Sequence, residues 1–320
     1  MKTIQITGVS FPVSQICLGC AFFGSRESKE LSYELMDYYY SQGGRFFNTS
    51  LVYAGGESER ILGSWVRERG VRSEVVLTSK SGQNPAYPQE ERMLGSTLTK
   101  DIDESLTRMG LDCLDFYMLH VDNRSVPVEE ILPALHEAQK AGKIRHYGCS
   151  NWHPDRQREA AAFARANGMQ GFVVDEVEFN LARNNRDNNG SCNWVDESYI
   201  ELHEADGICV GAYSALASGA LSQYVRDGST VNWRPWCAGM FDNPYNMEIA
   251  KRLKKLCDET GWTASQIQLA WLADHPFNFP TFSIIGASKV SQLEDSLQAH
   301  SITLTPEMIS YLRPDYREYL

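Results

Sequence analysis

Strand-type runs that end in polar side chains constrain the fold of this chain more than any other feature. The run RFFNTSLVY contains Asn48 and ends in Tyr53, VVLTSK ends in Lys80, and LDFYMLH ends in His120. A helix-type pattern follows each run and carries the chain back. Strands that alternate with helices form a parallel sheet, and in a closed (β/α)8 barrel the strand ends open on one face, where active sites are built. The sequence therefore predicts a barrel with a polar site at that face.

Strand-type and helix-type patterns alternate along the whole chain. We predict strands at residues 15–18, 46–48, 75–80, 114–120, 144–150, 172–176, 208–213 and 282–285. We predict helices at residues 29–42, 58–69, 98–109, 128–141, 155–167, 196–206, 246–260 and 291–298, with an extra helix at 265–273. No low-complexity linker or composition break interrupts this order. The fold class is therefore α/β, and we expect residues 1–320 to form a single (β/α)8 TIM-barrel domain.

Three stretches depart from the alternation. The N-terminal segment around Gly8 predicts a β-hairpin that closes the N-terminal end of the barrel. Residues 180–198 and 222–246 are long, polar and rich in aromatic residues, and we expect loops that shape a substrate pocket at the opposite face. Their aromatic rings either offer flat surfaces to a sugar or an aromatic ligand or pack the loops down. These rings belong to Trp194, Trp233, Trp236 and Phe241.

Composition narrows the classes of partner. The net charge of −11 and the absence of a Lys/Arg cluster argue against nucleic acid or an anionic membrane as a partner. No apolar run approaches the roughly 20 residues needed to span a bilayer, and the first residues lack a signal-peptide core, so we expect a cytoplasmic protein. The eight cysteines lack CxxC and disulfide-scaffold spacing, and we expect buried free thiols at Cys17, Cys149 and Cys209.

Several common functional motifs are absent from the sequence. There is no GxGxxG after a strand, no GxxxxGK(S/T), no HExxH and no GxSxG. A Rossmann nucleotide site, a phosphate loop, a zinc protease and a hydrolase elbow therefore have no support. The histidines show no metal-ligand spacing, so no metal site is expected. The polar residues at the strand ends remain as the carriers of chemistry.

Five blocks of residues occur in order along nearly the whole chain. They are FFNTSLVYAGGESERILG, EVVLTSK, DIDESLTRMGLDCLDFYMLHVD, GKIRHYGCSNW and SIIGASKVSQLEDSL. Together they resemble the aldo-keto reductase superfamily, and in particular its potassium-channel β subunit-like and bacterial aldo/keto reductase branch. The resemblance implies a (β/α)8 barrel with an NADP (or NAD) cofactor. It also implies hydride transfer between that cofactor and a small-molecule carbonyl compound, its alcohol or a sugar.

The resemblance implies roles for the residues at the strand ends. Tyr53 would be the acid/base that gives a proton to a carbonyl or takes one from an alcohol. A tyrosine is ordinarily protonated at neutral pH, and the ammonium of Lys80 would favour the phenolate. His120 would orient the substrate oxygen. Asn48 stands where the family has an Asp that pairs with the Lys.

The resemblance also implies a cofactor site. Ser150 and Asn151 would hold the nicotinamide carboxamide, and Tyr213 would stack on the ring. Glu176 stands where the family has a Gln that contacts the carboxamide. The remaining cofactor contacts would come from Ser214 and Leu216, from Gly286, Ser288, Lys289 and Gln292 at the adenosine end, with Lys289 a partner for a 2′-phosphate, and from Asp295 and Ser296 near the adenine.

The two departures from the family pattern favour alcohol oxidation. With Asn48 in place of an acid, we expect the ammonium of Lys80 to be less neutralised and Tyr53 to ionise more readily, so that it acts as a base. An ionised Glu176 near the nicotinamide would stabilise the positively charged oxidised ring. The opposing interpretation is that loss of the acid misorients Lys80 and leaves a slow or inactive enzyme.

Three functions stay open at this stage. The first is an NAD(P)-dependent oxidoreductase acting on a carbonyl compound or its alcohol. The second is a sugar-active enzyme in which tightly bound NAD(H) cycles within a redox-neutral elimination or hydrolysis. The third is a non-catalytic nicotinamide-sensing regulatory protein. The sequence does not decide the substrate, NAD against NADP, or the oligomeric state.

Overall fold

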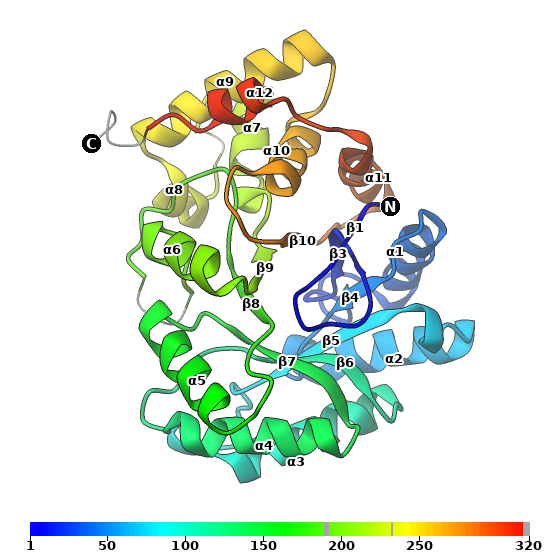
Figure 1. Ribbon diagram of the computed structural model, residues 1–320. Coiled ribbons are helices and arrows are strands. Elements are labelled where there is room, and N and C mark those ends of the chain that lie inside the picture. The colour runs from blue at the N-terminus through cyan, green and yellow to red at the C-terminus, as the bar shows by residue number, and fades with distance from the viewer. Residues whose placement is uncertain (189–191, 232, 316–320) are drawn as a thin grey trace.

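Eight parallel strands form a closed barrel in the computed structural model, which describes residues 1–188, 192–231 and 233–315 (Figure 1). The strands follow one another around the ring in the order β10-β3-β4-β5-β6-β7-β8-β9. Each predicted strand is present, with bounds within two residues of those expected. They are β3 (Ile16–Gly19), β4 (Phe46–Asn48), β5 (Val76–Ser81), β6 (Leu114–Leu119), β7 (Ile144–Ser150), β8 (Val174–Glu178), β9 (Cys209–Tyr213) and β10 (Thr281–Ile285).

Helices surround this barrel and cover its outer face (Figure 1). Those that the sequence predicts are α1 (Lys29–Ser41), α2 (Glu57–Arg69), α3 (Gly95–Met109), α4 (Val128–Lys140), α5 (Pro154–Ala166), α6 (Glu197–Asp206), α9 (Pro244–Thr260), α10 (Ala264–Asp274) and α11 (Val290–Leu297). Helix α4 continues through Pro133. Within the described ranges no helix is both long enough and apolar enough to cross a bilayer.

In the described part of the chain, three further α-helices are present that the sequence pattern did not predict. They are α7 (Ala220–Asp227), α8 (Pro235–Phe241) and α12 (Pro306–Leu312). The expected loop at residues 222–246 is therefore wrong in part, because it contains most of α7, all of α8 and the start of α9. Each of the three is at most eight residues long, too short for helical periodicity to stand out. Pro235 and Pro306 begin two of them, at the position where proline favours a helix start.

The N-terminal hairpin closes one end of the barrel, as the sequence predicts. Strands β1 (Thr3–Ile4) and β2 (Val13–Ser14) pair antiparallel, and Gly8 lies in the turn region with φ of 80°. The dark blue segment crosses the middle of the ring in Figure 1. Apolar side chains of this segment pack on rings from inside the barrel, in one cluster that includes Ile6, Val9, Val13, Phe46, Phe116 and Phe282. The hairpin leaves the opposite, C-terminal face for the site.

The aromatic residues of the two long stretches divide between packing and exposure. Trp233 and Phe241 are buried in a small apolar cluster, and Trp194 donates its Nε1 hydrogen to the Arg186 carbonyl at 2.8 Å. Trp236, by contrast, is 50% exposed and lines a groove at the C-terminal face. Packing therefore accounts for three of the four rings, and Trp236 is the one that presents a surface.

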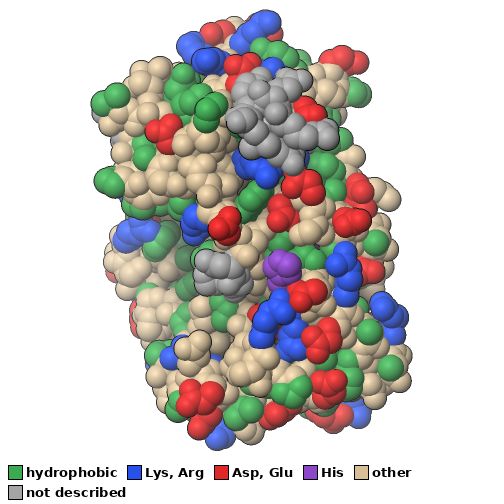
Figure 2. Space-filling view, turned by 90° about the vertical axis from the view of Figure 1, so that its left-hand side faces the viewer, with side chains coloured by type: hydrophobic (Ala, Val, Ile, Leu, Met, Phe, Trp, Pro, Cys, Tyr) green, Lys and Arg blue, Asp and Glu red, His purple; other side chains and the backbone are tan. Residues whose placement is uncertain are grey.

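Charged side chains of both signs are mixed on one face of the molecule (Figure 2), and the three predicted buried thiols are present. On the face that carries α5, α6 and α8, acidic and basic side chains are interspersed (Figure 2). Cys17, Cys149 and Cys209 are buried and free, as expected.

Candidate active site

The polar residues predicted at the strand ends come together in one cavity of about 370 Å³. Asn48 ends β4, Lys80 lies near the end of β5, His120 follows β6 directly, and Tyr53 begins a 3-10 turn after β4. The cavity is also lined by predicted cofactor contacts, which are Ser150, Asn151, Glu176, Tyr213 and Ser214, and by Gly286, which was predicted at the adenosine end. The carboxyl ends of parallel barrel strands open on one face, which explains why residues up to 238 positions apart meet there.

A buried triad of Lys80, Asn48 and Glu176 forms the floor of this cavity. Asn48 Nδ2 donates to Glu176 Oε1 at 2.6 Å, and Lys80 Nζ donates to Asn48 Oδ1. Lys80 Nζ also lies 3.3 Å from Glu176 Oε2 and donates to the Thr49 carbonyl at 2.9 Å. All three side chains of the triad are at most 3% exposed. The amide of Asn48 thus bridges an ammonium and a carboxylate.

The expectation that Asn48 leaves Lys80 less neutralised is wrong. Glu176 supplies that anion from β8, although the acid expected at position 48 is an amide. Strands β4 and β8 are four positions apart in the eight-stranded ring, so they stand opposite each other. The interior of an eight-stranded barrel is just wide enough for side chains to fill, and the two side chains therefore meet across it.

The triad sets the protonation of its members. Burial alone would lower the pKa of Lys80, but the Glu176 carboxylate and Tyr53 oppose it and raise the pKa of Lys80 above its ordinary value. Burial raises the pKa of Glu176, while Lys80 and Asn48 act in the opposite direction. Lys80 is therefore an ammonium at neutral pH, and its Nζ lies 3.3 Å from Glu176 Oε2.

Tyr53 and His120 face each other at the mouth of the cavity. Tyr53 Oη lies 3.5 Å from His120 Nε2, and the Lys80 ammonium lies 5.1 Å from the centre of the Tyr53 ring. His120 Nδ1 lies 3.2 Å from the Ser50 hydroxyl. A phenol, an imidazole and an ammonium thus converge on one small volume, where a substrate oxygen can contact the first two.

His120 is held as a neutral imidazole. Burial, with a smaller contribution from the Lys80 ammonium, lowers the pKa of His120 to about 3. A neutral imidazole exchanges one hydrogen bond as donor and one as acceptor. It can therefore orient a substrate oxygen without adding a second positive charge beside Lys80.

Backbone strain concentrates at this face. Within the described ranges, the non-glycine residues with positive φ are Ala54, Asn151, Ser214, Ala217 and Ser218. Each costs on the order of 1–3 kcal/mol and persists only where its surroundings hold it in place. Ala54 directly follows Tyr53, and Asn151 and Ser214 line the cavity. This clustering is a sign of a functional site that no sequence pattern revealed.

The predicted carboxamide contacts form a network of their own. Asn151 Nδ2 donates to the His120 carbonyl at 3.2 Å and to Ser150 Oγ at 3.0 Å. Tyr213 Oη donates to Asn151 Oδ1 at 2.7 Å, and the Asn193 backbone N–H donates to the same oxygen at 2.9 Å. The Asn151 amide is therefore fixed in one orientation, which leaves the Ser150 hydroxyl as the freer polar group.

The residues predicted at the adenosine end line a neighbouring groove of about 830 Å³. Ser288 donates to Gln292 Oε1 through both its backbone N–H, at 3.0 Å, and its hydroxyl, at 2.9 Å. Lys289 is exposed at the start of α11 and lies outside the wall of the groove. The predicted residues that do line it are Ser214, Leu216, Gly286, Ser288, Gln292, Asp295 and Ser296.

Three arginines of this groove escaped the sequence analysis. Arg26, Arg226 and Arg234 line it, and the guanidinium of Arg26 lies 3.2 Å from the centre of the Phe22 ring. They come from three separate segments, so no cluster of basic residues is visible along the chain. Glu27 and Asp295 also line the groove, and Arg226 pairs with Asp227 at 2.7 Å, so the three arginines stand against two acids on the wall.

The catalytic cavity and the groove are continuous. Both are lined by Phe22, Ser214, Ile284, Ile285 and Gly286, so they join into one trough. One end holds Tyr53 and the predicted carboxamide contacts, and the other holds the three arginines with Ser288, Gln292 and Ser296.

Fold and site together define a (β/α)8-barrel protein with a Tyr–Lys–His site at the C-terminal face of its strands. The model of the aldo/keto reductase family matches residues 15–314. The chain belongs to the aldo/keto reductase family, whose members are oxidoreductases that typically use NAD(P)H.

Three curated relatives show the range of similar proteins. An aryl-alcohol dehydrogenase [NADP(+)] of Phanerodontia chrysosporium is 25% identical over 95% of this chain and 83% of its own length. A probable voltage-gated potassium channel subunit beta of Arabidopsis thaliana is 27% identical over 82% of this chain and 80% of its own. The uncharacterized oxidoreductase YrpG of Bacillus subtilis is 27% identical over 94% of this chain and 91% of its own.

Proposed function

We propose that this protein is an NAD(P)(H)-dependent oxidoreductase that interconverts a carbonyl compound and its alcohol, with Tyr53 as the acid/base. The observation that carries the proposal is the position of Tyr53, whose Oη lies 3.5 Å from His120 Nε2 and whose ring centre lies 5.1 Å from the Lys80 ammonium. The cavity that holds this hydroxyl continues into the groove that fits a dinucleotide. The nicotinamide cofactor would supply the hydride, and this chain's residues would supply everything else.

The proton is the part of the reaction that these residues handle. In reduction, Tyr53 gives its phenolic proton to the substrate oxygen, and Lys80 stabilises the phenolate that remains. His120, as a neutral imidazole, holds the same oxygen by a hydrogen bond. In oxidation the proton returns from the alcohol to Tyr53. Asn48 and Glu176 hold Lys80 in place without contacting the substrate oxygen themselves.

The dinucleotide site is the other half of the proposal. Ser150, Asn151 and Tyr213 would hold the nicotinamide end. The three arginines would meet the phosphates of the cofactor. A guanidinium that contacts the 2′-phosphate, which NADP has and NAD lacks, would favour NADP over NAD. Gln292, Asp295 and Ser296 would bind the adenosine. Lys289 is left without this role, because it lies outside the groove wall.

Asn48, in place of the acid that the resemblance implies, gives no support to a preference for alcohol oxidation. Glu176 neutralises Lys80 in its stead. The negative charge of Glu176 is the remaining feature that would favour an oxidised, positively charged ring. We therefore propose a reaction that runs in both directions and follows the ratio of oxidised to reduced cofactor.

Cofactor titration together with turnover tests the proposal. Quenching of tryptophan fluorescence by NADPH and NADH measures binding, and loss of absorbance at the nicotinamide band measures reduction of aldehydes. Tyr53→Phe should keep binding and lose on the order of 10²- to 10⁴-fold in turnover, as expected for a general acid. Tyr38→Phe, on α1 and outside the cavities, is the matched control and should keep full activity.

Three other outcomes would favour a different function or contradict the proposal. Cofactor that co-purifies in stoichiometric amount and never exchanges with free NAD(P)H would favour the redox-neutral sugar enzyme. Binding without any turnover, equal in wild type and Tyr53→Phe, would favour a nicotinamide-sensing regulatory protein. Absence of binding would contradict the proposal altogether.

A further inference from the structure

The side chain of Asn151 uses all of its hydrogen-bonding capacity within the protein. Its Nδ2 donates to the His120 carbonyl at 3.2 Å and to Ser150 Oγ at 3.0 Å. Its Oδ1 accepts from Tyr213 Oη at 2.7 Å and from the Asn193 backbone N–H at 2.9 Å. An asparagine amide has two donor hydrogens and one acceptor oxygen with two lone pairs. Both hydrogens and both lone pairs of Asn151 therefore have partners before any cofactor binds.

The backbone of Asn151 is held in a strained conformation. Its φ is 59°, in the left-handed region that asparagine enters more readily than most residues but keeps only where its surroundings hold it. The Asn151 carbonyl accepts from Asn193 Nδ2 at 2.9 Å, and the Asn151 N–H donates to the Glu176 carbonyl at 3.1 Å. Asn193 therefore contacts Asn151 twice, once through its backbone and once through its side chain, and it is fully buried.

Asn193 comes from the long stretch at residues 180–198, and Glu178 ties that stretch to the end of β8. The Glu178 N–H donates to the Asn193 carbonyl at 3.0 Å, and the Glu178 carbonyl accepts from the Val195 N–H at 2.9 Å. The buried Glu178 carboxylate accepts from Asn184 Nδ2 at 3.0 Å and pairs with Arg186 at 3.0 Å. The stretch is thus anchored at one strand end and brings Asn193 to the neighbouring strand end, that of β7.

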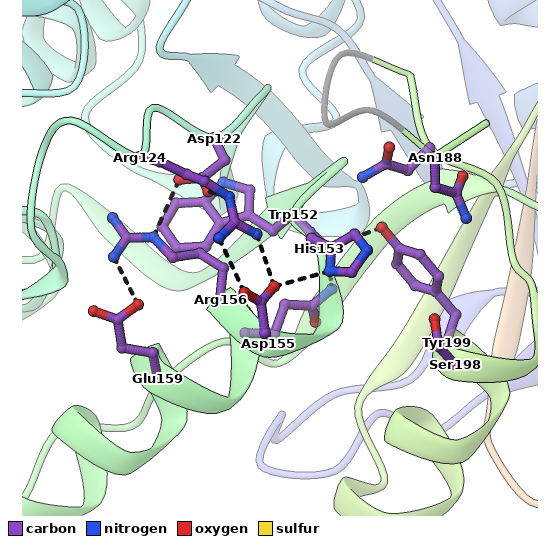
Figure 3. A network of polar contacts seen from close by, with 12 residues as sticks. Asp122, Arg124, Trp152, His153, Asp155, Arg156, Glu159, Asn188, Ser198 and Tyr199 are labelled. Carbon is purple, nitrogen blue, oxygen red and sulfur yellow. Dashed lines mark hydrogen bonds and ion pairs between the residues drawn. The ribbon is translucent and has the colours of Figure 1, made fainter.

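The residue after Asn151 is held by two helices. Figure 3 shows the Tyr199 hydroxyl, from α6, directed toward Trp152, and it donates to the Trp152 carbonyl at 3.1 Å. Gln157 Nε2, from α5, donates to the same carbonyl at 2.7 Å. The carbonyls of two successive residues, Asn151 and Trp152, thus accept hydrogen bonds from buried side chains. Support of this kind is expected where a functional segment must keep an unfavourable backbone conformation.

We propose that Asn193 is a positioning residue, which holds Asn151 so that Asn151 in turn orients the groups around the nicotinamide. Ser150 Oγ accepts from Asn151, so the Ser150 hydroxyl keeps its own hydrogen to donate to the carboxamide oxygen. The hydrogen bond from Tyr213 fixes the ring on which the nicotinamide would stack. In the described part of the chain, Asn193 itself lines neither the catalytic cavity nor the groove. The inference rests on the proposed oxidoreductase function and names a residue outside both cavities on which that function depends.

Two ligands that differ only in the nicotinamide test the inference. NADP+ and 2′-phospho-ADP-ribose share the adenosine, the phosphates and the second ribose, and only NADP+ carries the nicotinamide ring. In calorimetric titrations, Asn193→Ala should raise the dissociation constant of NADP+ by about threefold to tenfold, since the hydrogen bonds that orient the groups around the ring are loosened. The dissociation constant of 2′-phospho-ADP-ribose should change by less than about twofold, because distant sites act independently. Where NAD+ proves the tighter cofactor, NAD+ and ADP-ribose form the same pair.

Turnover adds a second readout. With saturating reduced cofactor, kcat of Asn193→Ala for an aldehyde should fall by on the order of tenfold, because a displaced ring slows hydride transfer. Tyr213→Phe keeps the aromatic ring and removes the hydroxyl that donates to Asn151. It should shift the ratio of the two dissociation constants in the same direction, and it tests the inference even if Asn193→Ala fails to fold.

Asn246→Ala is the matched control for loss of a buried asparagine. Asn246 is fully buried, and its Nδ2 donates at 2.8 Å to the carbonyl of Arg183 in the same long stretch. None of its hydrogen bonds among the described residues reaches Asn151. Asn246→Ala should therefore lower the stability and leave the ratio of the two dissociation constants as in wild type.

The outcomes separate the inference from the proposed function. Equal loss of affinity for the two ligands in Asn193→Ala would mean that Asn193 only supports the fold, and it would overturn the inference. A ratio unchanged in both Asn193→Ala and Tyr213→Phe would overturn it as well. In either case the proposed function would stand. Wild-type protein that binds 2′-phospho-ADP-ribose but neither NADP+ nor NAD+ would contradict the proposed function, and the inference with it.

Discussion

Asn48 on β4 donates a 2.6 Å hydrogen bond to Glu176 on β8, across the interior of the barrel. Through this contact, the amide and the acid act as one unit on Lys80. The site keeps one carboxylate and one amide around the ammonium, with the carboxylate at position 176. Compared with the family pattern, the two groups are exchanged between the two strands.

We expect the double variant Asn48→Asp/Glu176→Gln to lose less unfolding free energy than the two single variants lose together. Glu176→Gln leaves the buried Lys80 ammonium without an anion, which costs about 3–5 kcal/mol of unfolding free energy. Asn48→Asp removes the donor to Glu176 and places two carboxylates side by side. The double variant Asn48→Asp/Glu176→Gln restores one of each. We expect a coupling of about 1–3 kcal/mol in urea unfolding, with kcat/KM recovering in parallel.

A second pair of variants serves as the control for this cycle. Glu178 is the next acid along β8, and its carboxylate lies 3.0 Å from Arg186 rather than in the triad. Asn48→Asp combined with Glu178→Gln should therefore be additive. If the Asn48/Glu176 pair is equally additive, the two residues do not act as a unit.

Because His120 is neutral in the folded protein, we expect the stability of the protein to fall as the pH is lowered. Its pKa is lowered to about 3 in the folded protein, whereas an unfolded histidine titrates near 6.5. Below pH 6.5 the unfolded chain therefore binds a proton that the folded protein does not, and stability falls as the pH falls. Between pH 7 and pH 5 this group removes about 2 kcal/mol of unfolding free energy.

The measurement is urea unfolding of wild type and His120→Gln at both pH values. The variant should lose about 2 kcal/mol less than wild type between pH 7 and pH 5. His300→Gln, in a surface turn away from the site, should behave as wild type. A His120→Gln slope equal to that of wild type would mean that His120 is not held neutral.

In the turn after Tyr53, we expect two neighbouring substitutions, Ala54→Gly and Gly55→Ala, to have opposite effects on stability. Ala54 has φ of 50° and Gly55 has φ of 64°, both in the left-handed region that favours glycine. Ala54→Gly should therefore leave the stability unchanged or raise it by up to about 1 kcal/mol, because glycine adopts this conformation without steric cost. Gly55→Ala should lower it by about 1 kcal/mol, since a methyl group there meets no atom within 4 Å and the cost is in φ alone.

Activity adds a readout that stability does not give. A more flexible turn beside Tyr53 should lower kcat in Ala54→Gly while the dissociation constant for NADPH stays as in wild type. Thermal unfolding and steady-state kinetics on the two variants check both statements. Loss of stability in Ala54→Gly would show that the alanine methyl contributes more than the strained backbone costs.

We expect Trp236 to be the main source of the fluorescence quenching that NADPH causes when it binds. It is 50% exposed and lines the groove, whereas Trp233 is 6% exposed within the loop cluster. Trp236→Phe should therefore lose most of the quenching by NADPH. Trp233→Phe should keep the quenching and lose stability, because it shortens a buried side chain. Quenching retained in full by Trp236→Phe would mean that the dinucleotide does not lie along this groove.

Much of the architecture follows from the sequence alone. The alternation of strand and helix patterns predicts the barrel, because each segment carries its own periodicity. The same patterns predict that Tyr53, Lys80 and His120 meet, since all three lie at or just after a strand's carboxyl end. The short helices α7, α8 and α12 escaped that analysis because two turns give too little periodicity to recognise.

Only the tertiary structure decided which side chains of the site contact one another. Asn48 and Glu176 are 128 residues apart and look like two independent departures from a family pattern in the sequence. Closing the ring places β4 opposite β8, where Asn48 donates directly to Glu176 and both side chains contact Lys80. This arrangement reversed our expectation of a less neutralised ammonium. The arginines of the groove, which come from separate segments of the chain, follow the same rule. Local sequence determines which element a residue occupies, but the electrostatics of a buried group depend on neighbours that only barrel closure supplies.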